Sequence, residues 1–136
     1  MEFRSAIESD FESIISWIEN SDDCLTWAGP DVTFPMIPTA LKRQIEYTAG
    51  NSYCLLDKTE PVAFGQLLQK GEYHYHLARI IVAPVSRGRG YGYKICKHLI
   101  KRAHACDSRR LTLNVYRDNQ RAIGLYRHLG FVPAPP

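Results

Sequence analysis

Residues 80–92 read IIVAPVSRGRGYG, an apolar run followed by three glycines at alternate positions. The apolar run predicts a buried strand, and the glycine stretch Arg87–Gly92 is predicted to lie where a helix begins. Glycines allow a positive φ and let a ligand approach the main chain closely. Backbone N–H groups at the positive end of a helix dipole bind anions, and Arg87 and Arg89 add charged donors. The stretch therefore predicts an anion site at a β-to-α turn.

Other glycine-rich sites fit this stretch less well. A Walker P-loop ends in Gly-Lys-Ser or Gly-Lys-Thr, whereas this sequence has Gly90-Tyr91-Gly92. A dinucleotide-binding fingerprint spaces its glycines as G-x-G-x-x-G, whereas Gly88, Gly90 and Gly92 are evenly spaced. A flexible turn that is rich in glycine and arginine only for solubility remains an alternative for the stretch taken alone.

The sequence on either side predicts an α/β domain with a mixed sheet and helices on its faces. Strands are expected over residues 3–6, 52–57, 61–69, 73–82 and 110–115. Helices are expected from a capping box at Ser9–Glu12, from a Thr39 cap to Gly50, and over 90–106 and 119–129, with a loop over 24–38. The resulting order is β-α-α-β-β-β-α-β-α. The three central strands form an antiparallel meander, and the strand after the crossover helix should run parallel to the third of them.

Length and composition indicate an ordinary globular chain. The 136 residues suit one domain, 1–136, and 45% of them are hydrophobic. The net charge of +3 suits an anionic ligand but does not by itself argue for nucleic acid. Membrane spans and a secretion signal are not expected, because no apolar run reaches the required length. Four scattered cysteines favour reduced thiols in the cytoplasm, and they give no zinc pattern.

Two blocks of sequence carry a resemblance to a known family. The first block is Val82-x-Pro84-x-x-Arg87-Gly88-x-Gly90-x-Gly92, and the second is Leu113-Asn114-Val115-x-x-x-Asn119-x-x-Ala122-x-x-x-Tyr126-x-x-x-Gly130-Phe131. Together they resemble the motifs of the GCN5-related N-acetyltransferases (GNAT), whose cofactor motif is Arg/Gln-x-x-Gly-x-Gly/Ala. The resemblance implies an enzyme that moves the acetyl group of acetyl-CoA by direct transfer to a primary amine of a small molecule or peptide.

The same resemblance implies where the cofactor binds. In this family two neighbouring strands splay apart, and the pantetheine arm pairs with the edge of the first. The matching cofactor residues here are Ile80, Ile81 and Val82 for the arm and Arg87, Gly88, Arg89, Gly90, Tyr91 and Gly92 for the pyrophosphate. Asn119 matches a residue that meets the pantetheine or phosphate, although a helix N-cap explains it equally well.

Candidate catalytic residues follow from the resemblance and from the residue types. Tyr126 lies where the family places a tyrosine near the thioester sulfur, which makes it the candidate general acid, with a packing aromatic as the alternative. Some relatives carry a glutamate at the position of Asn114; asparagine takes up no proton, but it can orient water or substrate. His74 and His76 share one strand face and are candidate bases, and plain surface histidines are the alternative.

The acceptor side is less well defined by the sequence. Trp27 and Phe34 lie between the first two expected helices, where the family forms part of its acceptor pocket. Lys94, Lys97 and Lys101 share one helix side, either as a solvated face or as a contact to the adenosine phosphate. A non-catalytic acyl-CoA sensor is the alternative function, and an RNA-binding protein is a weaker one.

The end of the sequence departs from the family pattern. Relatives continue past Gly-Phe into two further strands, whereas this sequence ends at Pro136. The strand pair is therefore expected to be shortened or missing, which leaves an exposed strand edge. Either a second copy of the chain is expected to cover that edge, as a homodimer, or the acceptor site is expected to be unusually open.

Overall fold

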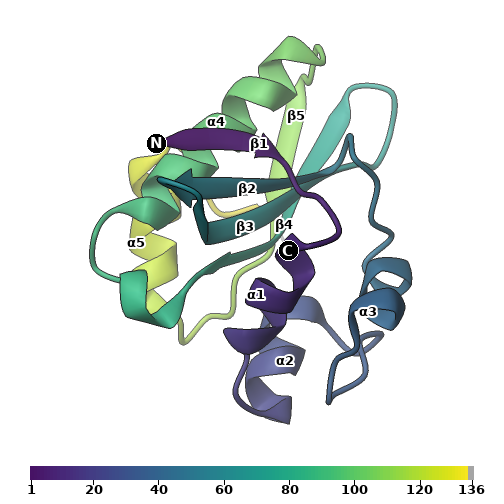
Figure 1. The fold of residues 1–136 in the computed structure, drawn as a ribbon. Helices are drawn as coiled ribbons and strands as arrows, with labels where there is room; N and C mark the ends of the chain where they lie inside the picture. The colour runs from purple at the N-terminus through teal and green to yellow at the C-terminus, as the bar shows by residue number, and fades with distance from the viewer. Residues whose placement is uncertain (135–136) are drawn as a thin grey trace.

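The computed structural model describes residues 1–134, which contain one five-stranded sheet with helices on both faces (Figure 1). Its strands are β1 (Glu2–Ser5), β2 (Ser52–Asp57), β3 (Glu60–Gln69), β4 (His74–Val82) and β5 (Arg110–Leu113), and they lie in that order across the sheet. The helices are α1 (Asp10–Ser16), α2 (Ser21–Ala28), α3 (Pro38–Gln44), α4 (Tyr91–Ala105) and α5 (Gln120–His128), with a short 3₁₀ turn, η1 (Pro84–Ser86), before α4.

The sheet has the mixed topology that the sequence predicts. β1 to β4 pair with their neighbours in antiparallel fashion, and β5 pairs with β4 in parallel. α4 makes the connection between β4 and β5 that a parallel pair requires. The α/β fold class and the β4–α4–β5 crossover are therefore confirmed.

Each face of the sheet buries its own hydrophobic core. α1, α2 and α3 cover one face, where Phe11, Ile14 and Leu41 pack against Phe64 of the sheet. α4 and α5 cover the other face, where Leu99 of α4 is fully buried. Because successive side chains of a strand point to opposite faces, β2 serves both cores: Cys54 and Leu56 face one and Tyr53 and Leu55 the other.

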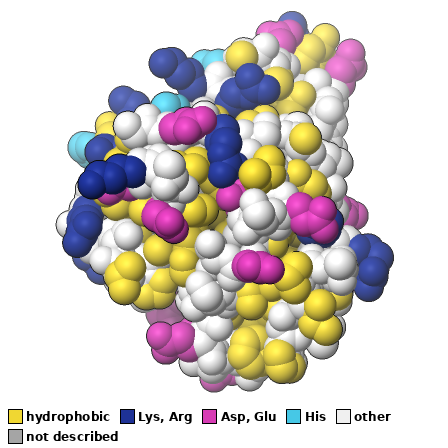
Figure 2. Space-filling model, viewed as in Figure 1, with side chains coloured by type: hydrophobic (Ala, Val, Ile, Leu, Met, Phe, Trp, Pro, Cys, Tyr) yellow, Lys and Arg dark blue, Asp and Glu magenta, His cyan; other side chains and the backbone are white. Residues whose placement is uncertain are grey.

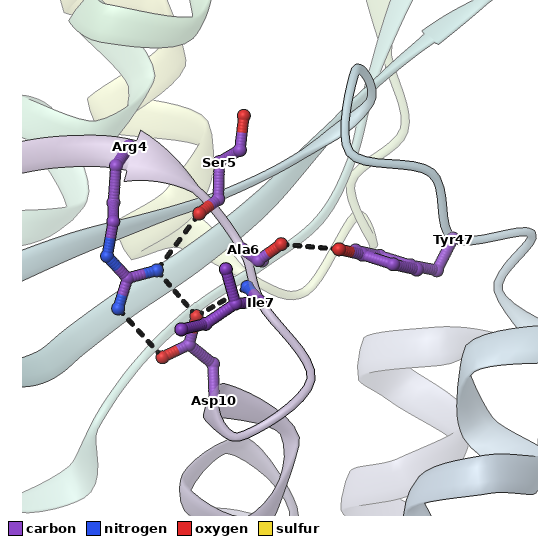
Figure 3. A network of polar contacts seen from close by, with 6 residues as sticks. All are labelled: Arg4, Ser5, Ala6, Ile7, Asp10 and Tyr47. Carbon is purple, nitrogen blue, oxygen red and sulfur yellow. Dashed lines mark hydrogen bonds and ion pairs between the residues drawn. The ribbon is translucent and has the colours of Figure 1, made fainter.

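The start of α1 differs from the predicted capping box. Ser9 has helical angles (φ −65°, ψ −19°) and makes no side-chain cap. The carboxylate of Asp10 instead binds the segments before the helix: it accepts the Ile7 N–H at 2.8 Å and two guanidinium bonds from Arg4 at 2.7 and 3.0 Å (Figure 3). The buried carboxylate thus ties β1 to α1, and Tyr47 adds a bond from its hydroxyl to the Ala6 carbonyl.

The segment between α1 and β2 also differs from the prediction. α2 occupies part of the expected 24–38 loop, and Asn20 caps it by accepting the Asp23 N–H at 2.8 Å. α3 begins one residue before the predicted Thr39 cap, because Pro38 suits the first helical position. α3 also ends at Gln44 rather than near Gly50.

The last part of the described chain has a short edge strand. β5 ends at Leu113, two residues earlier than predicted, and pairs only with β4 within residues 1–134. Gly130 terminates α5 with φ 102°, as predicted. No strand follows α5 up to residue 134, and Pro136, to which the predicted shortening refers, lies outside the described residues.

Candidate functional site

The two parallel strands, β4 and β5, separate halfway along β4. Their ladder runs from His74 opposite Arg110 to Leu77 opposite Leu113 and then stops. β4 itself continues to Val82 in register with β3. The β5 side of residues 78–82 is therefore without a strand partner in the described chain, and its backbone polar groups face a gap.

A bulge in β4 lies at the point of separation. Ala78 pairs with Gln66 and Ile81 with Phe64, so two residues of β4 stand opposite Gly65 alone. Arg79 occupies this bulge with φ 50°, a left-handed angle that is uncommon for a residue with a side chain. The bulge turns β4 away from β5 and gives Arg79 an orientation that a regular strand would not.

A groove of about 1080 Å³ crosses the sheet at this separation. Its walls come from α2, β4, the end of β5, the start of α4 and α5. Most of the residues predicted for cofactor and substrate line it: Trp27, His76, Ile80, Ile81, Val82, Arg87, Gly88, Gly90, Tyr91, Gly92, Asn114, Asn119 and Tyr126. The remaining predicted residues, His74, Phe34 and Arg89, do not line it. Phe34 packs against the core under α1 to α3.

The glycine loop has the geometry of an anion cradle. Gly88 and Gly90 have φ of 81° and 82°, and a Cβ added to either would meet nothing within 4 Å. Gly90 is the N-cap of α4, and the first bond of that helix is donated by Lys94 to the Gly90 carbonyl. The N–H groups of residues 91–93 therefore have no intrahelical acceptor and sit at the positive end of the dipole.

Gly92 differs from the two other glycines of the stretch. It is not among the glycines with positive φ. A Cβ at Gly92 would lie 3.6 Å from Leu125 Cδ2 and 3.7 Å from Val82 Cγ2. The third glycine of the motif therefore lies where α4 is in contact with α5 and β4.

Tyr126 projects from α5 into the groove. Burial, with a smaller contribution from Cys96, raises the pKa of its phenol well above the ordinary value. The ring packs edge-on against Phe131, with centroids 6.1 Å apart. The hydroxyl is therefore a proton-bearing donor at neutral pH, so the packing role and the donor role coexist.

His74 and His76 share one hydroxyl. Thr112 Oγ1 of β5 lies 2.8 Å from Nε2 of His74 and 2.7 Å from Nδ1 of His76. Of the two histidines, only His76 lines the groove. Burial, helped by the charges of Lys70 and His74, lowers the pKa of His76. Its imidazole is consequently neutral at pH 7, with one nitrogen held by Thr112.

The two predicted asparagines occupy the groove in different ways. Asn119 caps α5, where its side chain accepts the Ala122 N–H at 3.2 Å, and it also lines the groove. Asn114 directly follows the end of β5, where it is exposed. The position of Asn119 is therefore compatible both with a helix N-cap and with a contact to the cofactor.

Arg79 lines the groove and was not singled out by sequence. The indole N–H of Trp27 donates to its carbonyl at 2.8 Å, which joins α2 to the β4 bulge. A signal was present in the sequence, because Arg79 is the one charged residue in the otherwise apolar run LARIIV.

The lysines of α4 lie outside the groove. Lys94, Lys97 and Lys101 line a separate hollow with His98, Ile100 and His104. Figure 2 shows basic side chains, with histidines among them, gathered over the region where α4 runs. These three lysines are exposed, which agrees with a solvated face.

No group of three or more metal-ligating side chains lies together in residues 1–134. None of the helices in that range combines the length and the apolar character that crossing a membrane requires.

Comparison with known proteins connects this geometry to a family. A model described as "Acetyltransferase (GNAT) family" matches residues 14–131. The peptidyl-lysine N-acetyltransferase YjaB of Salmonella typhimurium is 35% identical, over 74% of this chain and 68% of that protein.

Solved structures share the fold. The ribosomal-protein-S18-alanine N-acetyltransferase of Escherichia coli has a TM-score of 0.75 at 22% identity, covering 98% of this chain and 79% of that chain. Rv2747 of Mycobacterium tuberculosis, solved in complex with CoA and NLQ, has a TM-score of 0.73 at 14% identity, covering 99% and 74%.

Proposed function

We propose that this chain, which belongs to the acetyltransferase (GNAT) family, transfers the acetyl group of acetyl-CoA directly to a primary amine of a small molecule or peptide. Membership makes it an acetyl-CoA-dependent N-acetyltransferase. The observation that carries the proposal is one groove that joins a separated strand edge, an anion cradle and a half-buried tyrosine. The strand edge and the cradle would bind the acetyl donor, and the tyrosine would serve the departing thiol.

The groove fits coenzyme A at the glycine loop. Gly88 and Gly90 leave the backbone open where any side chain would project, so phosphate oxygens can reach the N–H groups. We assign the pyrophosphate to Arg87–Gly92, including Arg89 at the rim, and the pantetheine amides to the free edge of residues 80–82. Asn119 would complete this half of the site. When bound, the cofactor supplies the acetyl group as a thioester.

The acceptor amine must be neutral before it can attack. Deprotonating an amine with the pKa of lysine, about 10.4, costs roughly 4–5 kcal/mol at pH 7. His76 suits the role of base because its imidazole is neutral and lines the groove. Thr112 holds one nitrogen of His76 and also contacts His74, which makes His74 a positioning residue in this proposal. Asn114 would orient the amine or a water.

The departing thiolate requires a proton donor. Tyr126 retains its proton because burial raises its pKa, and it lies in the same groove. A buried neutral phenol donates a hydrogen bond more strongly than one exposed to water. We assign to Tyr126 the hydrogen bond, and finally the proton, that the sulfur takes up.

Partners and location follow from other features of the chain. Trp27 would form an aromatic wall of the acceptor half, and a peptide lysine is one candidate acceptor because the YjaB relative is named for it. The edge strand β5 supports a homodimer in which a second copy pairs with it. All four cysteines are free, which supports a reducing compartment such as the cytoplasm.

The proposal is tested with acetyl-CoA and a panel of amines that includes lysine peptides, peptide N-termini and small amines. We expect thiol release that depends on the amine, and a protein mass that stays unchanged when acetyl-CoA is added without acceptor. An acetylated protein that passes its acetyl group to the amine would rule out direct transfer. Binding of coenzyme A with no turnover of any amine would instead favour a sensor.

A further inference from the structure

Arg79 combines burial, charge and position in the groove in a way that packing does not require. Its guanidinium is half-buried and lines the acceptor half of the groove, beside Trp27 and the end of α2. Nε donates to the Ala28 carbonyl at 3.2 Å and Nη1 to Gln66 Oε1 at 2.8 Å. Both partners are neutral oxygens.

Gln66, on the side of the guanidinium away from the groove, holds it in position. Gln66 is fully buried, and its Nε2 donates at 3.0 Å both to the Ile45 carbonyl and to Ser52 Oγ. These two bonds set the orientation of the amide, so its oxygen must face Arg79. The Trp27 indole fixes the backbone of Arg79 in the same way. A side chain that only filled space would not need two fixed partners and a fixed backbone.

The charge of Arg79 lacks a counter-ion within the described chain. The ion pairs among residues 1–134 are Arg4–Asp10, Lys42–Glu8 and Arg109–Asp107. Burial lowers the pKa of Arg79, and the carboxylates of Glu46 and Asp31 offset this only in part. Removing a cation from water without a paired anion is costly, and a bound anion would remove that cost.

Donors remain available for such an anion. A guanidinium carries five N–H donors, and Arg79 commits one at Nε and one at Nη1. No buried side-chain nitrogen or oxygen in the described residues lacks a partner, so the unbonded Nη2 is open to the groove or to solvent. The free donors form the fork that carboxylates and phosphates bind in bidentate fashion.

We propose that Arg79 binds an oxyanion of the acceptor, so that the preferred substrate is an amine that also carries a carboxylate or a phosphate. This inference rests on the proposed acetyl transfer and adds the chemical class of the acceptor. Lys70, Arg87 and Arg121 also line the groove and make it basic, while Asp23 of α2 is the acidic residue of the lining. In a lysine peptide, a neighbouring acidic side chain would supply the oxyanion.

The test uses pairs of amines that differ only in the anion. The pairs are amino acids against their amides, O-phosphoethanolamine against ethanolamine, and lysine peptides flanked by Glu against the same peptides flanked by Gln. The wild type should show a KM about tenfold lower for the anionic member of at least one pair. Which pair responds distinguishes carboxylate from phosphate.

Variants separate substrate binding from a structural role. Arg79→Gln should remove the preference, because it should raise KM for the anionic member far more than KM for the neutral member. Arg79→Lys keeps the positive charge but loses the paired N–H donors of the guanidinium, so it should retain a weaker preference for the anionic member. This variant tests the proposal if Arg79→Gln does not fold. Arg43→Gln, an exposed position on α3 outside the groove, is the matched control and should behave as wild type.

The inference is overturned if the wild type prefers no anionic member, or if Arg79→Gln impairs both members of a pair equally. Thermal stabilisation by the same amines in the presence of coenzyme A gives a readout without turnover. If no amine is acetylated, the proposed function fails. Even then, the Arg79 site is supported if only the anionic members raise the melting temperature and Arg79→Gln abolishes that rise. The site is rejected if both members of a pair raise the melting temperature equally.

Discussion

Replacing Gly90 by alanine tests whether the glycine loop holds the cofactor. Gly90 has φ 82°, and a Cβ there would meet no protein atom within 4 Å. The added methyl group therefore clashes with nothing in the free protein and strains only the backbone. It would project from the cradle, into the space assigned to the pyrophosphate.

The expected magnitudes follow from this geometry. A left-handed angle costs an L-residue roughly 1–2 kcal/mol. For a chain of this length, that lowers the melting temperature by roughly 4–7 °C. Losing one backbone hydrogen bond to a charged phosphate costs about 1.5–3 kcal/mol, or roughly 10- to 100-fold in affinity. At a ligand concentration about 100 times the wild-type Kd, the stabilisation of about 2.7 kcal/mol would fall to about 1.4 kcal/mol or less.

Gly130→Ala is the matched control for this substitution. Gly130 also has a positive φ, 102°, and open space at the Cβ position, but it ends α5 outside the groove. Both variants should lose a similar few degrees of melting temperature. Only Gly90→Ala should lose most of the stabilisation by coenzyme A and show a raised KM for acetyl-CoA. An equal response of the two variants to coenzyme A would refute the assignment of the loop.

Three further predictions concern the catalytic residues and the fold. Tyr126→Phe should lower kcat by about tenfold or more with little change in KM for acetyl-CoA, and an unchanged kcat would remove its acid role. In the wild type, kcat/KM should fall with decreasing pH below about pH 6.5, because the pKa of His76 is lowered. His76→Asn should remove this fall. If kcat/KM still falls in the variant, another residue is the base. Asp10→Asn should destabilise the fold by about 2–4 kcal/mol in chemical denaturation, since it leaves Arg4 without its carboxylate. Burial alone would raise the pKa of Asp10, but the bonds from Arg4 and Ile7 outweigh it and lower that pKa. The ionised carboxylate therefore stabilises the fold above about pH 3.9, and this stabilisation is lost as the pH falls through the lowered pKa of folded Asp10. The unfolding free energies of wild type and Asp10→Asn should therefore converge in acid. A difference that stays constant with pH would contradict the pairing.

Features with a local signal in the sequence were predicted well. β2 has the predicted bounds Ser52–Asp57, and β3 and β4 each differ by one residue, because turn residues and strand periodicity define them locally. The family and the use of acetyl-CoA were predicted from two motifs, and the α/β fold from the order of strands and helices; all three are confirmed. Most predicted site residues also converge on one groove.

Features that depend on tertiary contacts were missed. The role of Asp10 requires Arg4 of β1 beside it, so the local pattern at Ser9 indicated the wrong cap. The cap of α2 by Asn20 is a local signal, and it was nevertheless missed. Arg79 gains its partners from α2 and β3, which are 51 and 13 residues away in the chain. Neither periodicity nor propensity describes such contacts.

The most direct measurement compares the products of one reaction. The protein is incubated with acetyl-CoA and an amine that it accepts, the released thiol is titrated, and the acetylated amine is quantified by mass spectrometry. Direct transfer in the groove predicts one acetylated amine for each thiol released, with both products reduced together in Tyr126→Phe. Thiol release without an acetylated amine, or release that is independent of the amine, would contradict it.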